Sequence, residues 1–301
     1  MKVIIVGLGV QGNKRLAVAG ADVIATVDPV IASAQFKSIR DVPLGSFDAA
    51  LVCVPDRAKT ATLEYFLANG KHVLVEKPLL ADSERLRDLA GQNRVTCYTA
   101  YNHRFEPHLV RVKQVLDKGQ LGKIYLCRMF YGNGTAMDVK RSPWRDRGLG
   151  ALTDLGSHML DLALFFFGES SRNFQLWAGS RFENQTYDHF LLGSTGAPLM
   201  EFEGTMVSWR NTFTLDIFGE EGSVHVFCLC KWGPSTFTLR QRVRPSGRPP
   251  EQTATVEMKD PTWALEYEHF KNCCRTGTSN IANDIWINAA LKQLAGQEEL
   301  L

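Results

Sequence analysis

The sequence predicts an α/β protein in two parts. Residues 1–120 are expected to form a parallel, doubly wound sheet, and residues 121–301 an α+β part with a large, mostly antiparallel, open-faced sheet. In the first part, short apolar runs alternate with helical stretches, which is typical of a parallel sheet covered by helices. The second part is rich in aromatic and β-branched residues with period-two alternation, which favours half-buried strands. A chain of 301 residues is long enough for two cores.

Five apolar runs of the first part are the predicted strands: Val3 to Val6, Val23 to Val27, Ala49 to Val54, His72 to Val75 and Val95 to Thr99. The predicted helices are Gln11 to Ala19, Ala58 to Asn69, a helix capped by Asp82 or Ser83, and Pro107 to Lys118. Ligands of such sheets gather outside the carboxyl ends of the strands. The residues that directly follow the strands are therefore expected at one edge: Gly7, Asp28, Pro55, Lys77 and His103.

Six segments of the second part are predicted strands: Lys123 to Tyr131, Asn173 to Phe182, Tyr187 to Gly193, Leu199 to Met206, Thr212 to Phe218 and Ser223 to Cys228. The predicted helices are Asp154 to Phe167, Trp263 to Arg275 and Ala282 to Leu294, the last of which is free to pack back on the first part. Gly219 to Gly222 is a predicted hairpin turn, and Arg242 to Pro250 a predicted mobile loop. One face of the sheet needs a second subunit to cover it, so we expect a homodimer or homotetramer.

The composition is that of an ordinary globular protein, with 45% hydrophobic and 22% charged residues. A net charge of +2 argues against a nucleic-acid partner. No apolar run reaches the length of a bilayer, and the chain begins on an apolar run without a basic leader. We therefore expect a cytoplasmic protein with no membrane partner.

Seven cysteines are present, without a C-x-x-C pair. Cys228 and Cys230 are expected to point the same way on one strand, an arrangement that suits a metal. In a reducing compartment, buried free thiols are far commoner than cysteines that bind a metal, so we expect neither zinc nor a disulfide.

The first predicted strand runs into Gly7-Leu8-Gly9-Val10-Gln11-Gly12, and Asp28 closes the second. Gly7 allows a tight turn, Gly9 lets the backbone approach a pyrophosphate, and Gly12 lets the helix pack close to the strand. The pyrophosphate would then bind N–H groups at the helix start. This pattern predicts a Rossmann dinucleotide site rather than an ordinary glycine-rich turn.

Asp28 favours NAD as the cofactor, because a carboxylate there accepts from the ribose 2′-hydroxyl and repels a 2′-phosphate. Lys14 and Arg15 are close enough in sequence to keep NADP open. The predicted cofactor-binding residues are Gly7, Gly9, Val10, Gln11, Gly12, Asp28, Val54, Pro55, Glu76 and Lys77.

Two further motifs point to an enzyme. Glu76-Lys77-Pro78 places a lysine at a strand end, where it can stabilise the alkoxide that forms as a hydride leaves; the alternative is a surface lysine in a turn. In the stretch from Gly148 to Asp161, Asp154, His158 and Asp161 fall on one side of a helix. A carboxylate beside an imidazole raises the basicity of the imidazole and fixes its orientation, as a general base requires. The alternatives are that Thr153 or Asp154 caps the helix and that His158 is a core histidine.

Together these residues resemble the Gfo/Idh/MocA family of NAD(P)-dependent oxidoreductases. The resemblance rests on the three glycines, on Gly70-Lys71-His72-Val73 running into Glu76-Lys77-Pro78, on Asn102-His103-Arg104-Phe105, and on the stretch from Gly150 to Asp161. It implies a Rossmann domain joined to an α/β domain whose open sheet forms the oligomer interface. It also implies that Lys77, Asp154 and His158 act on a sugar or cyclitol hydroxyl.

The expected activity is hydride transfer between a nicotinamide cofactor and a hydroxyl or keto carbon of a sugar, cyclitol or nucleotide sugar. His158 takes the hydroxyl proton, Lys77 hydrogen-bonds the same oxygen, and Asp154 orients the substrate or the pair. Two alternatives remain. One is a glycosidase that uses NAD for transient oxidation, and the other is a noncatalytic dinucleotide-binding sensor.

The chain departs from the family pattern in three places. The segment after Asp28 is short, Val54 to Ala58 lacks a histidine that relatives often carry, and Leu149 interrupts a glycine-rich stretch. The loop from Lys140 to Arg147 is either a solvated charged loop or a source of substrate contacts. The predicted substrate-binding residues are Lys77, His103, Arg104, Trp144, Arg145, Asp154 and His158.

Overall fold

The computed structural model describes residues 1–142, 145–169 and 173–296. The chain forms two compact units, one of Met1–Asn102 with Thr262–Asn288, the other of His103–Pro261 with the chain from Ala289 onward. These units differ from the predicted division at residue 120. Helix α4 (Pro107–Asp117) goes with the second unit because it packs against a helix and two strands there, and α7 (Thr262–Thr276) goes with the first because it packs against α1 (Val10–Ala19).

The first unit contains the expected parallel sheet. Its strands are β1 (Val3–Val6), β2 (Val23–Val27), β3 (Ala49–Val52), β4 (His72–Glu76) and β5 (Cys97–Ala100), in the order β2-β1-β3-β4-β5. Its other helices are α2 (Asp56–Ala68), α3 (Ser83–Asn93) and the larger part of α8 (Ile281–Ala295). Of the two predicted caps of α3, Asp82 is the one used, since its carboxylate accepts from Arg85 N at 3.0 Å.

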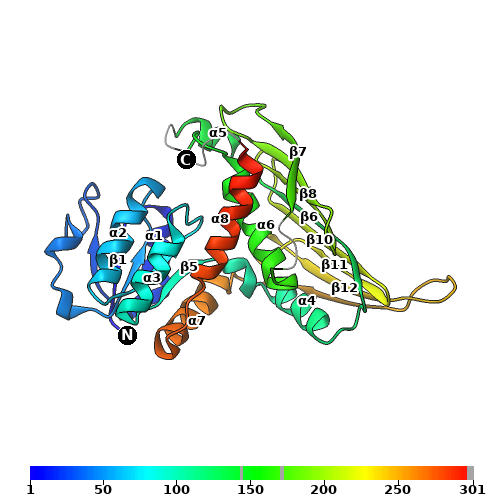
Figure 1. Ribbon diagram of the computed structural model, residues 1–301, viewed down its shortest axis with the longest axis horizontal. Helices are drawn as coiled ribbons and strands as arrows, with labels where there is room; N and C mark the ends of the chain where they lie inside the picture. The colour runs from blue at the N-terminus through cyan, green and yellow to red at the C-terminus, as the bar shows by residue number, and fades with distance from the viewer. Residues whose placement is uncertain (143–144, 170–172, 297–301) are drawn as a thin grey trace. The chain divides into compact units, whose positions relative to one another are not determined.

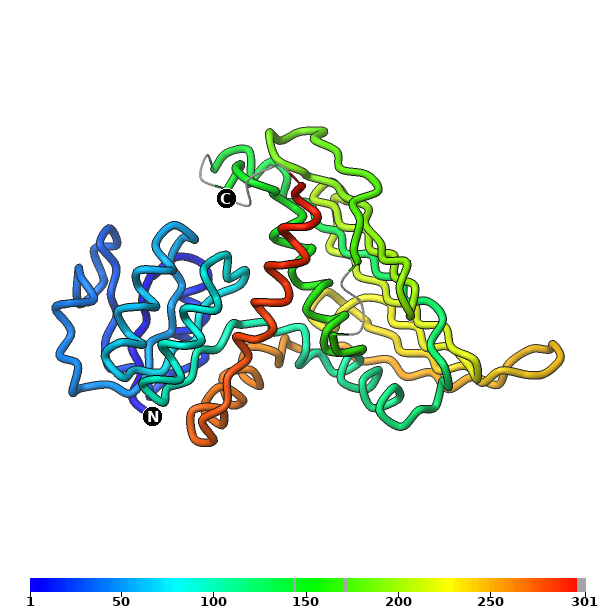
Figure 2. Tube along the Cα trace, viewed as in Figure 1, coloured from blue at the N-terminus to red at the C-terminus, as the bar shows by residue number. Residues whose placement is uncertain are grey.

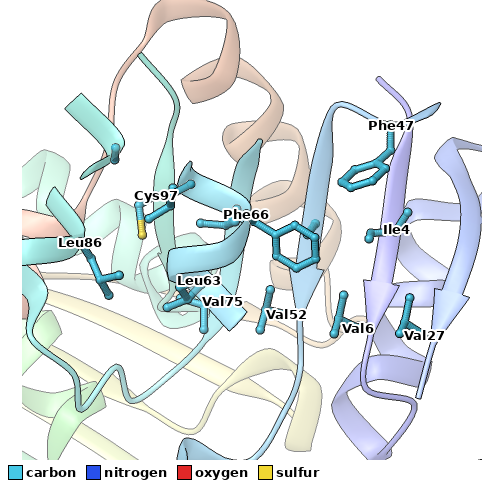
Figure 3. Packing of buried hydrophobic residues seen from close by; sticks show 14 of the residues in the cluster. Ile4, Val6, Val27, Phe47, Val52, Leu63, Phe66, Val75, Leu86 and Cys97 are labelled. Atoms are coloured by element: carbon cyan, nitrogen blue, oxygen red, sulfur yellow. The ribbon is translucent and has the colours of Figure 1, made fainter. Parts of the chain in front are cut away.

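Helices cover both faces of this sheet. On one face α2 and α3 pack against alternate strand residues, and Phe66 and Leu63 lie over Val52 and Val75 (Figure 3). On the other face the intervening residues pack against α1 and α7. Strands buried on both faces must be apolar throughout, which explains why the short apolar runs predicted them well.

The second unit contains an eight-stranded sheet in the order β13-β12-β11-β10-β6-β9-β8-β7, in which only β6 and β9 pair in parallel. Its strands are β6 (Ile124–Gly132), β7 (Phe174–Ser180), β8 (His189–Ser194), β9 (Leu199–Thr205), β10 (Thr212–Gly219), β11 (Gly222–Phe227), β12 (Ser235–Gln241) and β13 (Glu251–Val256). The predicted hairpin between β10 and β11 is confirmed. The loop 242–250 joins β12 to β13 and extends from their hairpin (Figure 2).

Strands β12 and β13 and the short helix α5 (Ala136–Lys140) were not predicted from the sequence. Strand β13 is an edge strand whose residues are exposed or half-buried, so it lacks the apolar alternation that predicts a strand. Helix α5 has five residues, too few for a helical period to show.

Helices cover one face of the large sheet within its unit. Helix α6 (Ala151–Phe167) packs on β6, β8 and β9, and α4 packs on β11 and β12 (Figure 1). The inward residues of β10, such as Leu215, are buried, whereas the outward ones include Phe218 at 37% exposure. The alternation confirms the predicted open-faced sheet. Among the described helices, none combines the length and the hydrophobicity needed to cross a bilayer.

Candidate functional site

The glycine-rich turn of the first unit has the close packing that the motif predicts. Gly7 has a φ of +92°, and a Cβ there would lie 2.5 Å from the carbonyl oxygen of Cys53. A Cβ on Gly12 would lie 1.8 Å from the carbonyl oxygen of Gly7. Both positions therefore require glycine.

The N-terminus of α1 fits a pyrophosphate. A Cβ on Gly9 would meet no described atom within 4 Å, so the backbone there faces open space. Gly9 is the N-cap and no side chain of the described residues caps the helix, while Val10 is 74% exposed. Backbone N–H groups at an uncapped, accessible helix start bind anions well. The residues present thus fit a dinucleotide.

Asp28 connects the turn to the end of β2. Its Oδ2 accepts from Leu8 N at 2.8 Å, and its Oδ1 accepts from Val30 N at 2.8 Å and Ile31 N at 2.9 Å. Burial raises the pKa of Asp28, but these N–H donors and Lys37 outweigh burial and hold the pKa below its ordinary 3.8. The ionised carboxylate therefore stabilises the conformation of the glycine-rich turn.

We expect Asp28→Asn to lower the free energy of unfolding at neutral pH by about 1–3 kcal/mol, because an amide replaces one charged acceptor oxygen with a donor. The folded-state pKa of Asp28 is lowered, so its contribution is present above pH 3.8 and disappears as the pH falls through the folded-state pKa. Urea unfolding at pH 7 and in acid measures this. Asp48→Asn is the control, since Asp48 accepts from Lys2 N at an exposed site. Equal losses for both variants at both pH values contradict the prediction.

Arg15 is not available to bind a 2′-phosphate. It is 1% exposed, its Nε donates to Glu76 Oε1 and its Nη2 to Glu266 Oε2, each at 2.7 Å. Its guanidinium also lies 4.2 Å from the centre of the Trp263 ring. Arg15 therefore gives no reason to expect NADP, contrary to the sequence interpretation. Lys14 is exposed, with its Nζ 5.0 Å from the same ring centre.

Of the residues expected at one sheet edge, Gly7, Asp28, Pro55 and Lys77 follow strands of the first unit, whereas His103 belongs to the second unit. Val54 and Pro55 follow β3, and Pro55 is the N-cap of α2. Lys77 directly follows β4, whose last residue is Glu76. This edge holds the carboxyl ends of all five strands.

Helix α6 of the second unit carries Asp154 and His158. The helix begins at Ala151, whose N–H donates to Tyr187 O at 2.7 Å. The alternative that Thr153 or Asp154 caps it is therefore wrong, because the chain turns into the helix earlier and both residues lie in its first turn. Thr153 Oγ1 instead donates to Gly150 O at 2.9 Å.

The ring of His158 stacks on that of His103. Their centroids are 4.0 Å apart with an interplanar angle of 16°, and the Tyr131 ring lies 6.0 Å from His158. His103 and His158 are 2% and 6% exposed. Both histidines were predicted substrate-binding residues, but their stacking on each other was not predicted from the sequence.

Asp161 pairs with Arg104 rather than with the histidine. Arg104 Nε and Nη2 donate to its two carboxylate oxygens at 2.8 and 2.7 Å. Asp161 is 1% exposed, and burial raises its pKa although Arg104 lowers it. Arg104 is thus engaged in a bidentate pair that links the turn 102–105 to α6.

The loop before α6 is tied to the loop after β7. The carboxylate of Asp146 accepts from Gln185 N and Thr186 N, both at 3.0 Å from Oδ1. Arg145 is half-buried, and its N–H donates to Ser142 O at 2.7 Å. Trp144, the proposed stacking residue, lies outside the described residues.

Cys228 and Cys230 do not lie on one strand, so that prediction is wrong. Strand β11 ends at Phe227, and the chain turns at Cys228, which has a φ of +65°. Cys230 instead donates its thiol to Glu106 Oε2 at 3.1 Å. Within the described part of the chain no group of three or more histidine, cysteine, aspartate or glutamate residues could hold a metal ion.

Two family models match the chain. Residues 1–101 match the model of an oxidoreductase family with an NAD-binding Rossmann fold, and residues 109–225 match the model of the GFO/IDH/MocA C-terminal domain.

Curated relatives include inositol 2-dehydrogenase of Rhizobium meliloti (strain 1021), which is 29% identical over 53% of this chain and 50% of its own length. The scyllo-inositol 2-dehydrogenase (NAD(+)) of Bacillus subtilis (strain 168) is 25% identical over 79% of this chain and 70% of its own. The chain thus spans about half the length of the first relative. Among solved structures, levoglucosan dehydrogenase in complex with NADH has a similar fold, with a TM-score of 0.82, 18% identity and 98% of each chain covered.

Proposed function

Because this chain belongs to the Gfo/Idh/MocA family of oxidoreductases, we propose that it is an NAD-dependent dehydrogenase or reductase acting on a CH–OH group of a sugar, cyclitol or nucleotide sugar. The observation that carries the proposal is the open, uncapped start of α1 beside Asp28, a place for a dinucleotide. The named activities of the relatives, on inositols, supply the substrate class.

Asp28 favours NAD, since a ribose 2′-hydroxyl can donate to its carboxylate and a 2′-phosphate is repelled by it. Arg15 is neutralised by two glutamates, so it does not offset that repulsion. NADP stays an alternative, because one relative in Bacillus subtilis is named scyllo-inositol 2-dehydrogenase (NADP(+)) IolW.

Three side chains are assigned to the reaction. His158 takes the hydroxyl proton, Lys77 donates a hydrogen bond to the developing alkoxide, and Asp154 orients the substrate. When bound, the nicotinamide accepts or returns the hydride. His103 supports the His158 ring by stacking. His103, Arg104 and Arg145 are candidates for substrate contact, with Arg104 oriented by its pair with Asp161.

The test is to purify the protein, identify retained dinucleotide by mass, and screen sugars, cyclitols and nucleotide sugars for NADH formation. Substrate-dependent NADH formation supports the proposal. Glycoside cleavage without net NADH favours the glycosidase alternative, and dinucleotide binding without turnover of any substrate favours the sensor.

The proposed assembly is a homodimer or homotetramer through the open face of the large sheet. That face carries exposed apolar side chains on neighbouring strands, Phe218 at 37% and Phe227 at 58% exposure. Light scattering should find a dimer or tetramer, and Phe227→Glu should shift it toward monomer. A monomeric wild-type protein contradicts this proposal. The cytoplasmic location stays a prediction.

A further inference from the structure

Lys59 on α2 is a buried lysine that is hydrogen-bonded to the main chain just after Lys77. It is 3% exposed, and its Nζ donates to the carbonyl oxygen of Pro78 at 2.6 Å. The same Nζ lies 2.7 Å from Asp56 Oδ1. An Asp56–Lys59 pair one helical turn apart can form at a surface, so the pair alone does not explain the burial.

Burying an ammonium group is costly unless its partners compensate. Burial lowers the pKa of Lys59, which the charges of Asp56 and Glu76 oppose, while the like charge of Lys77 lowers it further. Lys59 is therefore bonded to the residue next to Lys77 in the chain, although the like charge of Lys77 disfavours its ammonium form. The bond to Pro78 O is the compensation specific to this location.

Other buried side chains hold the same segment. Arg15 binds Glu76, the residue before Lys77, and is itself fixed by Glu266. On the far side, Asn288 Nδ2 donates to Leu79 O at 2.8 Å. Lys59 and Asn288 thus bond the main chain just after Lys77, and Arg15 bonds the side chain of the residue before it.

We propose that Lys59 is a positioning residue that fixes the place of the Lys77 ammonium through Pro78. This inference rests on the proposed role of Lys77 and extends it to a residue outside the motif. Hydride transfer is sensitive to misplacement, and an error of about 1 Å can cost about 100-fold in rate.

The test is Lys59→Met, which keeps the volume of the side chain and removes its donor and charge. We expect kcat to fall by about 10–100-fold, with the Kd for NADH and the KM within a few-fold of wild type. Lys71→Met is the matched control, since Lys71 Nζ donates to Phe47 O at 2.8 Å in the same unit. Its kcat should not change. If Lys59→Met does not fold, Lys59→Leu, which also removes the donor and the charge, replaces it with the same expected fall in kcat.

A double-mutant cycle separates this inference from the proposed function. If Lys59 acts through Lys77, Lys59→Met has no further effect on single-turnover hydride transfer in the Lys77→Ala background. Additive losses, or wild-type kcat in folded Lys59→Met beside an impaired Lys77→Ala, overturn the positioning role alone. Wild-type turnover of Lys77→Ala instead overturns the role assigned to Lys77 and the inference with it.

A readout without substrate is the rate at which Lys77 is acylated, followed by peptide mass spectrometry. It should change several-fold in Lys59→Met and not in Lys71→Met. No change in the former overturns the proposal.

Discussion

We expect Lys77→Ala and His158→Ala each to lower turnover by about 10²–10⁴-fold, the range for losing a group that transfers the proton or stabilises the alkoxide in the transition state. The Kd for the dinucleotide stays near wild type, because the glycine turn, Asp28 and the start of α1 are unchanged. Single-turnover kinetics with the substrate found in the screen, together with NADH titration, measure the two quantities separately.

Two matched variants serve as controls for these losses. Lys71→Ala removes a lysine of the first unit that bonds a carbonyl remote in sequence from the motif, and His225→Ala removes a histidine on the open face of the large sheet. Both should turn over substrate normally. A parallel loss of dinucleotide binding and turnover in Lys77→Ala argues against its role, since it indicates damage to the cofactor site.

We expect Arg104→Met to lower the free energy of unfolding by about 3–5 kcal/mol, because it leaves the carboxylate of Asp161 buried without its bidentate partner. The pKa of Asp161, already raised by burial, rises further once Arg104 no longer opposes it. The deficit is therefore largest at neutral pH and shrinks as the pH falls and the carboxyl takes up a proton. Urea unfolding at several pH values measures it.

Arg128→Met is the comparison, since Arg128 pairs with Glu201 on the exposed sheet face at 3.1 Å. Such surface pairs contribute about 0–1 kcal/mol. Arg104→Met/Asp161→Leu should recover part of the loss by removing both charges. A deficit of the same size in Arg104→Met and Arg128→Met refutes the view that burial makes the Arg104 pair important.

The sequence predicted the fold well where burial is uniform. Strand β1 was found with its bounds because Val3–Val6 is buried on both faces. The prediction failed where the signal is weak or comes from residues distant in the chain: the first N–H of α6, that of Ala151, donates to the carbonyl of Tyr187, and the edge strand β13 is polar.

Only the parts of the candidate site whose residues lie close together in the sequence were predicted. The glycine turn and Lys77 are marked by short motifs, which spacing can reveal. The stacking of His103 on His158 and the pairing of Arg15 with Glu266 join residues far apart in sequence, and no periodicity connects them. Lys59 was missed because a lysine on an amphipathic helix ordinarily faces water.

Because the first sheet needs α7 to cover one of its faces, it cannot finish folding until α7 has been synthesised. Tyr267 and Phe270 are buried against β1, β3 and β4, and Glu266 completes the pairing of Arg15. During translation, residues 1–102 leave the ribosome long before 262–276 are made. Until then one apolar side of the nascent sheet lacks its cover, a state that chaperones recognise. A fragment ending at residue 102 should consequently aggregate when expressed alone, and coexpressing the missing segment should improve its yield.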